Sequence, residues 1–126
     1  MCAEPKIRKI LVIDDDPVTV KLAEARLQAN GYTVLTSTDA PNGLEKAMTL
    51  KPDLIILDVM MPIVNGYNFC RLLKSQHEHK GIPIVLLTSR SDEDDKKIGR
   101  EVGADAYITK PFNIDELLNT IKELVV

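Results

Sequence analysis

Five short apolar segments recur along the chain, each separated from the next by a stretch long enough for a helix. They are rich in aliphatic and β-branched residues, which is typical of strands buried on both faces of a sheet. Strands joined by helices run parallel, and right-handed crossovers then cover both faces of the sheet. The pattern therefore predicts an α/β fold with a doubly wound, five-stranded parallel sheet and five helices. The expected strands are residues 9–14, 33–38, 54–58, 83–89 and 106–110.

Capping residues indicate where the first and last helices begin and end. Pro17 is expected near the start of the first helix, and Gly31 just after its end. Asn113 is the expected N-cap of the last helix, because Glu116 follows three residues later in a near match to a capping box. An apolar stripe along this helix is expected to face the sheet.

The intervening helices carry weaker signals. The second helix is expected over residues 41–50, because a proline at position 41 biases Ala40 away from helical angles. Ser91 is expected to precede the fourth helix, which Gly103 closes. The third helix is expected to pack through Phe69, Cys70, Leu72 and Leu73.

Composition favours one domain in a reducing compartment. The chain has 126 residues, enough for a single core, and we expect an N-terminal extension over residues 1–8 and the domain over residues 9–126. A net charge of −3 gives no basic surplus for direct binding of nucleic acid. No signal peptide or membrane-spanning run is expected, and the two cysteines are expected to be free thiols. These features predict a cytoplasmic location.

Polar residues stand where the apolar segments end. Asp14 and Asp15 end the first, Asp58 the third, Thr88 the fourth and Lys110 the fifth. The carboxyl ends of parallel strands meet at one edge of a sheet, where ligands bind. Converging carboxylates repel one another unless a cation lies among them, and oxygen ligands suit Mg²⁺. A lysine and a hydroxyl suit phosphoryl oxygens, and a carboxylate beside Mg²⁺ can be a nucleophile that forms an aspartyl phosphate.

These residues lie in motifs that resemble the receiver domain of bacterial two-component response regulators. The motifs "VIDDD", "PDLIILDVMMP", "GY", "PIVLLTS" and "GADAYITKPF" match in order, and the resemblance extends over about residues 9–125. It implies a flavodoxin-like fold with strand order 2-1-3-4-5. It also implies that Asp58 becomes the 4-aspartylphosphate and that Asp15 binds Mg²⁺ directly. Asp14 would act on the metal through water, and Met60 would offer its backbone carbonyl.

The resemblance also implies how such a domain works. Thr88 and Lys110 would sense the phosphoryl group, and Tyr107 would be an aromatic switch residue. A histidine kinase or a histidine phosphotransfer protein would donate the phosphoryl group. A homodimer would form through the fourth helix, fifth strand and fifth helix. The domain would catalyse its own phosphorylation and slow dephosphorylation without being a conventional enzyme.

Simpler explanations exist for each acid, and two other functions compete. Acids such as Asp14, Asp15 and Asp16 are also favourable at a helix N-terminus, and Asp58 could accept backbone N–H groups. A phosphohydrolase or phosphotransferase of the haloacid dehalogenase type would place a second acid where Met60 stands. A docking module that is never phosphorylated is disfavoured by the complete set of acids, hydroxyl and lysine. The signalling switch is therefore the prediction.

Overall fold

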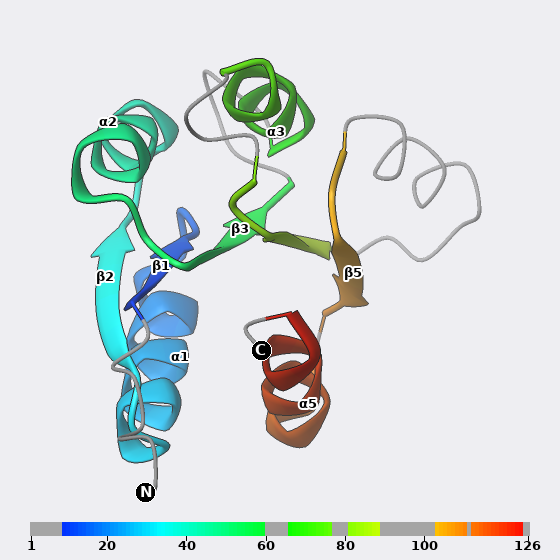
Figure 1. Ribbon diagram of the computed structural model, residues 1–126. Helices are drawn as coiled ribbons and strands as arrows, with labels where there is room; N and C mark the ends of the chain where they lie inside the picture. Colours follow the sequence, from blue (N-terminus) through cyan, green and yellow to red (C-terminus); the bar gives the residue numbers. More distant parts are fainter. Residues whose placement is uncertain (1–8, 60–65, 77–80, 89–102, 111, 125–126) are drawn as a thin grey trace, which may run out of the picture.

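A five-stranded parallel sheet forms the centre of the molecule (Figure 1). The computed structural model describes residues 9–59, 66–76, 81–88, 103–110 and 112–124. Its strand order is β2-β1-β3-β4-β5, and every pairing is parallel, which confirms the predicted fold. The elements are β1 (Lys9–Ile13), α1 (Pro17–Ala29), β2 (Thr33–Ser37), α2 (Ala40–Leu50), β3 (Leu54–Asp58), α3 (Gly66–Lys74), β4 (Ile84–Thr88), β5 (Ala106–Thr109) and α5 (Ile114–Leu124).

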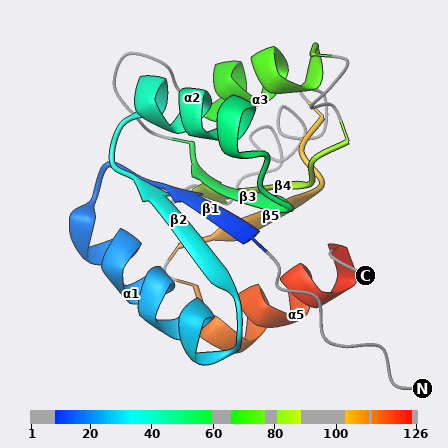
Figure 2. The same ribbon diagram turned by 60° about the vertical axis from the view of Figure 1, so that its left-hand side comes forward.

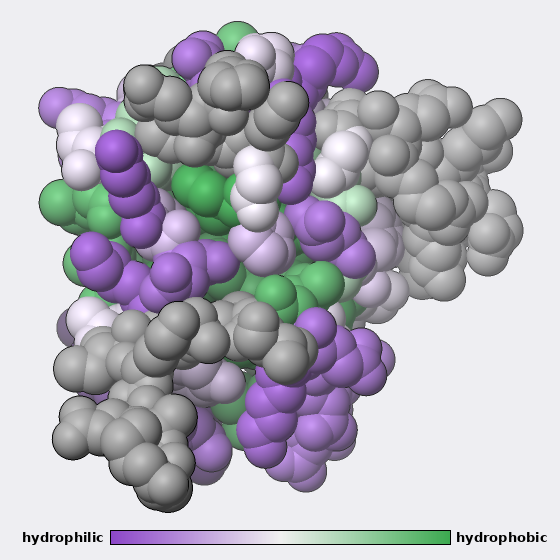
Figure 3. Space-filling model, in the orientation of Figure 1, coloured by the Kyte–Doolittle hydropathy of each residue, from purple (hydrophilic) through white to green (hydrophobic). Residues whose placement is uncertain are grey.

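Helices cover both faces of the sheet. Figures 1 and 2 show α2 and α3 on one face and α1 and α5 on the other. Each pair buries its own apolar cluster against the strands, with Phe69 of α3 in the first cluster and Leu117 of α5 in the second. β3 and β4 lie between the two clusters and are buried along their whole length. In Figure 3, polar side chains gather over the outer side of α5.

The helix ends follow the predicted caps. The Asp16 carboxylate accepts the Val18 N–H at 3.0 Å and so caps α1. Gly31 ends the same helix with a φ of 91°, and its N–H donates to the Gln28 carbonyl. The Asn113 side chain accepts the Asp115 N–H at 2.7 Å at the start of α5. Local side-chain chemistry therefore sets these boundaries.

The predicted strands agree with the structure to within one residue at each end, and two other local predictions differ from it. α2 begins at Ala40, one residue earlier than expected, because the Asp39 carboxylate accepts the Asn42 N–H and Ala40 is buried. Leu72 is 47% exposed, so its predicted packing is wrong, whereas the other three predicted residues of α3 are fully buried. The expected fourth helix and residues 1–8 lie outside the described residues. No helix in the described ranges has the length and apolar character needed to cross a membrane.

Gly43 allows α2 to approach the sheet closely. A Cβ at this position would lie 2.7 Å from Cδ1 and 2.9 Å from Cγ1 of Ile13, the last residue of β1. Ile13 is fully buried in the same cluster, so its side chain has little room to move. The glycine thus fixes how closely α2 packs beside the strand that leads into Asp14.

We expect Gly43→Ala to lower the free energy of unfolding by about 1 kcal/mol. Overpacking costs about 1–3 kcal/mol, and the better helix propensity of alanine returns about 1 kcal/mol. Urea denaturation gives the value. Gly81→Ala is the matched control, because a Cβ at Gly81 meets nothing within 4 Å. Adding Ile13→Val to Gly43→Ala should remove part of the penalty, and an unchanged or increased stability of Gly43→Ala would contradict the close contact.

Candidate functional site

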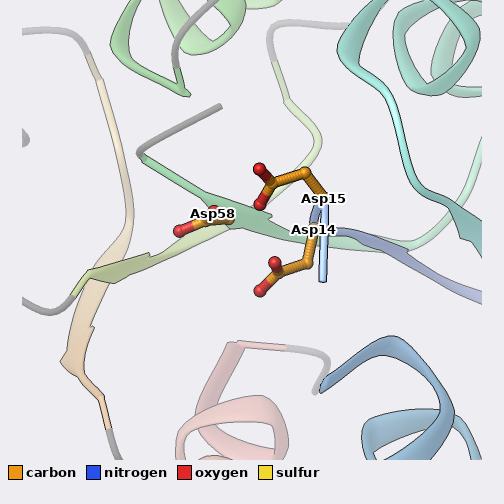
Figure 4. Close-up of side chains that lie close together, drawn as sticks. All are labelled: Asp14, Asp15 and Asp58. Atoms are coloured by element: carbon orange, nitrogen blue, oxygen red, sulfur yellow. The ribbon is translucent and has the colours of Figure 1, made fainter. Parts of the chain in front are cut away.

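Three carboxylates meet beyond the ends of β1 and β3. One oxygen atom from each of Asp14, Asp15 and Asp58 lies within 4.8 Å of the others. Figure 4 shows Asp14 and Asp15 directed to opposite sides of the sheet, with Asp58 between them. Asp14 is fully buried, Asp58 is nearly so, and Asp15 is exposed. Two acids of the cluster are therefore buried, and the third is open to solvent.

Lys110 follows β5, the last strand in the order of the described sheet, and also lies in this cluster. Its Nζ lies 2.6 Å from Asp14 Oδ2 and 3.4 Å from Asp58 Oδ1. Burial alone would lower the pKa of the Lys110 ammonium, but the hydrogen bond and charge of Asp14, together with Asp58, raise it above its ordinary value. Lys110 is therefore charged at neutral pH and partly offsets the negative charge of the acids.

The backbone positions these groups. β3 and β4 pair so that Asp58 lies opposite Leu87, and Val59 donates its N–H to the Leu87 carbonyl at 2.9 Å. Thr88, the next residue of β4, is fully buried, and its carbonyl accepts the N–H of Lys110. Neighbouring parallel strands thus bring Asp58, Thr88 and Lys110 to the same edge of the sheet.

The turn after β1 holds Asp14 in place. Its Oδ1 accepts the Asp16 N–H at 3.0 Å, and its own N–H donates to the Ser37 carbonyl of β2. Asp16 itself points to the helix: hydrogen bonds from the Thr19 hydroxyl and the Val18 N–H lower the pKa of its carboxyl. Adjacent acids in the sequence therefore have different roles. Asp16 caps α1, whereas Asp14 faces Lys110.

The acids fit a hard divalent cation. Mg²⁺ takes oxygen ligands at about 2.0–2.1 Å, so ligand atoms around it lie at most about 4 Å apart. One oxygen of each of the three carboxylates lies within 4.8 Å of the others, close to this limit, and Mg²⁺ usually keeps several waters among its ligands. Two of the acids already face a single ammonium group, so a second cation would relieve the remaining repulsion.

One of the predicted residues, Tyr107, lies away from this cluster. Tyr107 is on β5, half-buried against the apolar cluster that α2 and α3 cover. Its hydroxyl lies 3.4 Å from the hydroxyl of Tyr67 on α3. Tyr67 lies in the "GY" motif, but the sequence did not predict its contact with Tyr107, because the two tyrosines are 40 residues apart and only the packing of α3 brings them together. Met60 lies outside the described residues.

Comparisons with known proteins agree with one another. The family model of the response regulator receiver domain matches residues 10–122. Over 118 residues, 94% of this chain and 48% of the relative, the sequence is 43% identical to the alkaline phosphatase synthesis transcriptional regulatory protein PhoP of Bacillus subtilis. The chain thus spans about half the length of this curated relative.

Solved structures give the same result. The chemotaxis protein CheY4 of Vibrio cholerae has a TM-score of 0.89 at 34% identity, covering 94% of this chain and 99% of that one. The receiver domain of a sensor histidine kinase from Pseudomonas aeruginosa has a TM-score of 0.87 at 28% identity, covering 95% and 98%. That structure has a magnesium ion coordinated in its active-site cleft.

We expect Lys110→Met to lower the unfolding free energy of the metal-free protein by about 2 kcal/mol, because Asp14 keeps a buried charge without its cation. The same change should tighten Mg²⁺ binding about tenfold, because a competing positive charge is removed. Urea denaturation in chelator and calorimetric titration with Mg²⁺ measure the two effects.

Lys46→Met is the control for this experiment. Lys46 is also half-buried and donates a hydrogen bond, but its acceptor is the Thr36 carbonyl of β2. It should leave Mg²⁺ affinity at the parental value. Parental stability and parental Mg²⁺ affinity in Lys110→Met would show that the ion pair does not hold the acid cluster together.

Proposed function

The chain belongs to the response regulator receiver domain family, whose members are phospho-accepting signalling switches, and we propose that Asp58 is its phosphoacceptor. One observation carries this proposal. The Asp58 side chain is only 7% exposed at the end of a wholly buried strand, yet it shares Lys110 with Asp14. A structural acid in that position would gain little from two further acids and a lysine beside it.

The proposed reaction uses the carboxylate of Asp58 as a nucleophile. One of its oxygens attacks the phosphorus of a phosphohistidine, the P–N bond breaks, and the electron pair leaves with the histidine nitrogen. The product is an aspartyl phosphate, the 4-aspartylphosphate of Asp58. The short distance between Lys110 and the acids supports a role for this ammonium in stabilising negative charge on the transferred group.

The metal proposed for this reaction is Mg²⁺. Asp15 and Asp58 would hold it directly, Asp14 through water, and the Met60 backbone carbonyl would complete the protein ligands. When bound, the ion supplies neutralisation of the charge that gathers on the phosphoryl oxygens. The magnesium-containing relative supports this assignment.

Phosphorylation is proposed to change the domain through the ends of β4 and β5. Thr88 would donate its hydroxyl to a phosphoryl oxygen, and Lys110 would leave Asp14 to contact the same group. Tyr107, on the strand that leads to Lys110, would report the change as the switch residue. A phosphoryl group that contacts one arrangement better than another shifts the population between them.

Members of this family interact with histidine kinases and are usually linked to output domains. For this chain we propose a histidine kinase or a histidine phosphotransfer protein as donor, and a homodimer through the fourth helix, β5 and α5. The output of the whole protein is also a proposal, because the chain spans only about half the length of these curated relatives. A transcriptional output, as in the name of the Bacillus relative, is the form we propose.

We also propose the boundaries of the domain and the compartment in which it acts. The domain is proposed to occupy residues 9–126 after an extension of residues 1–8, and the family match over residues 10–122 supports the first boundary. A cytoplasmic setting without direct nucleic acid or membrane contact is proposed. The domain would catalyse only its own phosphorylation and slow dephosphorylation.

Asp58→Asn should abolish phosphate incorporation from acetyl phosphate in Mg²⁺, because an amide is a far poorer nucleophile than a carboxylate. Intact-mass spectrometry detects the adduct. Asp53→Asn is the matched control, since this exposed acid stands just before the opposite end of β3 and accepts the Lys9 N–H. A full phosphate adduct on the Asp58 variant would move the nucleophile to another residue.

Asp15→Asn should weaken Mg²⁺ binding by about tenfold or more while slightly raising the unfolding free energy of the metal-free protein, because one of three crowded charges is lost. Calorimetric titration measures the affinity. Asp16→Asn is a stringent control: it makes the same change one residue away, and asparagine remains a good N-cap for α1. Equal Mg²⁺ affinity in both variants would argue that Asp15 is not a ligand.

A further inference from the structure

The two tyrosines on α3 and β5 form a polar contact within an otherwise apolar layer. The hydroxyl oxygens of Tyr67 and Tyr107 lie 3.4 Å apart, long for a hydrogen bond between hydroxyls but within reach of one. Both rings are half-buried and pack against the apolar cluster on the α2 and α3 face. Neither hydroxyl is needed for that packing, so the contact adds a specific link between two elements.

This link joins two elements that lie near site residues in the sequence. Tyr67 follows Asp58 by nine residues, near the start of α3. Tyr107 precedes Lys110 by three residues and lies opposite Leu86 in the pairing of β4 with β5. A displacement of either segment relative to the other would change the distance between the hydroxyls.

The two ends of β5 are held in different ways. Before the strand begins, Asp105 accepts hydrogen bonds from Lys74 of α3 and from the Ile84 N–H, at 3.0 and 2.9 Å. Figures 1 and 2 both show α3 beside the chain leading into β5. After the strand ends, Lys110 is held by Asp14 and Asp58. The first anchor is distant from the acids, whereas the second depends directly on them.

Between these anchors, β5 pairs with β4 along its whole length, and Lys110 donates its N–H to the Thr88 carbonyl. The strand is four residues long and is the last strand in the described sheet, with β4 as its neighbour. Ile108 anchors it to the α1 and α5 face, and Tyr107 is its side-chain contact with the α3 face. Tyr107 lies between these two anchors, two residues after Asp105 and three before Lys110, so a shift of Lys110 away from Asp14 would reach it along the strand.

We infer that the Tyr67 hydroxyl is a positioning group that holds Tyr107 in the arrangement where Lys110 pairs with Asp14. The inference rests on the proposed function and assigns to Tyr67 a part in its regulation. Because the contact belongs to this arrangement, losing it favours the alternative in which Lys110 contacts a phosphoryl group. Tyr67 therefore sets how readily the domain responds, without touching the reacting atoms.

The test uses beryllofluoride, a phosphoryl mimic, added with Mg²⁺ to the full chain. The protein contains three tyrosines, so 3-fluorotyrosine labelling gives three ¹⁹F signals, which single tyrosine-to-phenylalanine variants assign. We expect Tyr67→Phe to shift the Tyr107 signal before beryllofluoride is added. It should also lower the beryllofluoride concentration at half-conversion by about two- to fivefold, the effect of one modest hydrogen bond.

Two further variants separate positioning from packing. Tyr107→Phe should lower the half-conversion concentration by a similar factor, and the double variant no further than either single one, because both remove the same contact. Tyr32→Phe is the matched control, since Tyr32 packs on the α1 and α5 face. It should leave the half-conversion concentration unchanged.

The outcomes distinguish the inference from the function on which it rests. A half-conversion concentration in Tyr67→Phe that is unchanged or raised, or effects that add in the double variant, would overturn the inference. A loss of thermal stability with unchanged beryllofluoride response would do the same, because it assigns Tyr67 a packing role only. A parent protein that does not respond to beryllofluoride would instead overturn the proposed function, and the inference with it.

Discussion

The ion pair between Lys110 and Asp14 is the contact around which the functional edge of this domain is organised. It joins the end of β5 to the end of β1, across the end of β3, which carries Asp58. A fully buried carboxylate is costly unless a cation and hydrogen bonds accompany it, and here Lys110 and the Asp16 N–H provide both. The sheet brings these groups together because all of its strands end at one edge.

The same contact explains why the site can act as a switch. Lys110 also lies 3.4 Å from Asp58, so one ammonium group is shared between a structural partner and the proposed phosphoacceptor. A change of charge at Asp58 alters the balance between them, and the altered position of Lys110 passes directly to a short edge strand. Asp105 holds the other end of β5 through Lys74 and the Ile84 N–H, so Tyr107 lies between a fixed contact and one that depends on the acids. We propose that stability and signalling thus depend on one side chain.

Much of the fold could be predicted from local pattern. Alternating apolar and helical segments identified all five strands, and the Asp16, Gly31 and Asn113 caps set helix ends, since each acts within a few residues of the chain. Errors occurred where tertiary packing decided. Leu72 and Leu73 are equally apolar neighbours, but only the position of α3 on the sheet determines which of them is buried. Gly43, which weakens a helix locally, is required by the nearby Ile13 side chain.

The sequence by itself determined the fold class, the strand ends and the set of acids, hydroxyl and lysine that gather there, because residue type and strand direction suffice for that inference. The tertiary structure alone decided which acid Lys110 contacts most closely, that Asp14 is buried while Asp15 is exposed, and that Tyr67 meets Tyr107. These are contacts between segments far apart in the chain or choices between adjacent residues. Their outcome depends on distances of a few ångströms, which only the packing of helices on the sheet fixes.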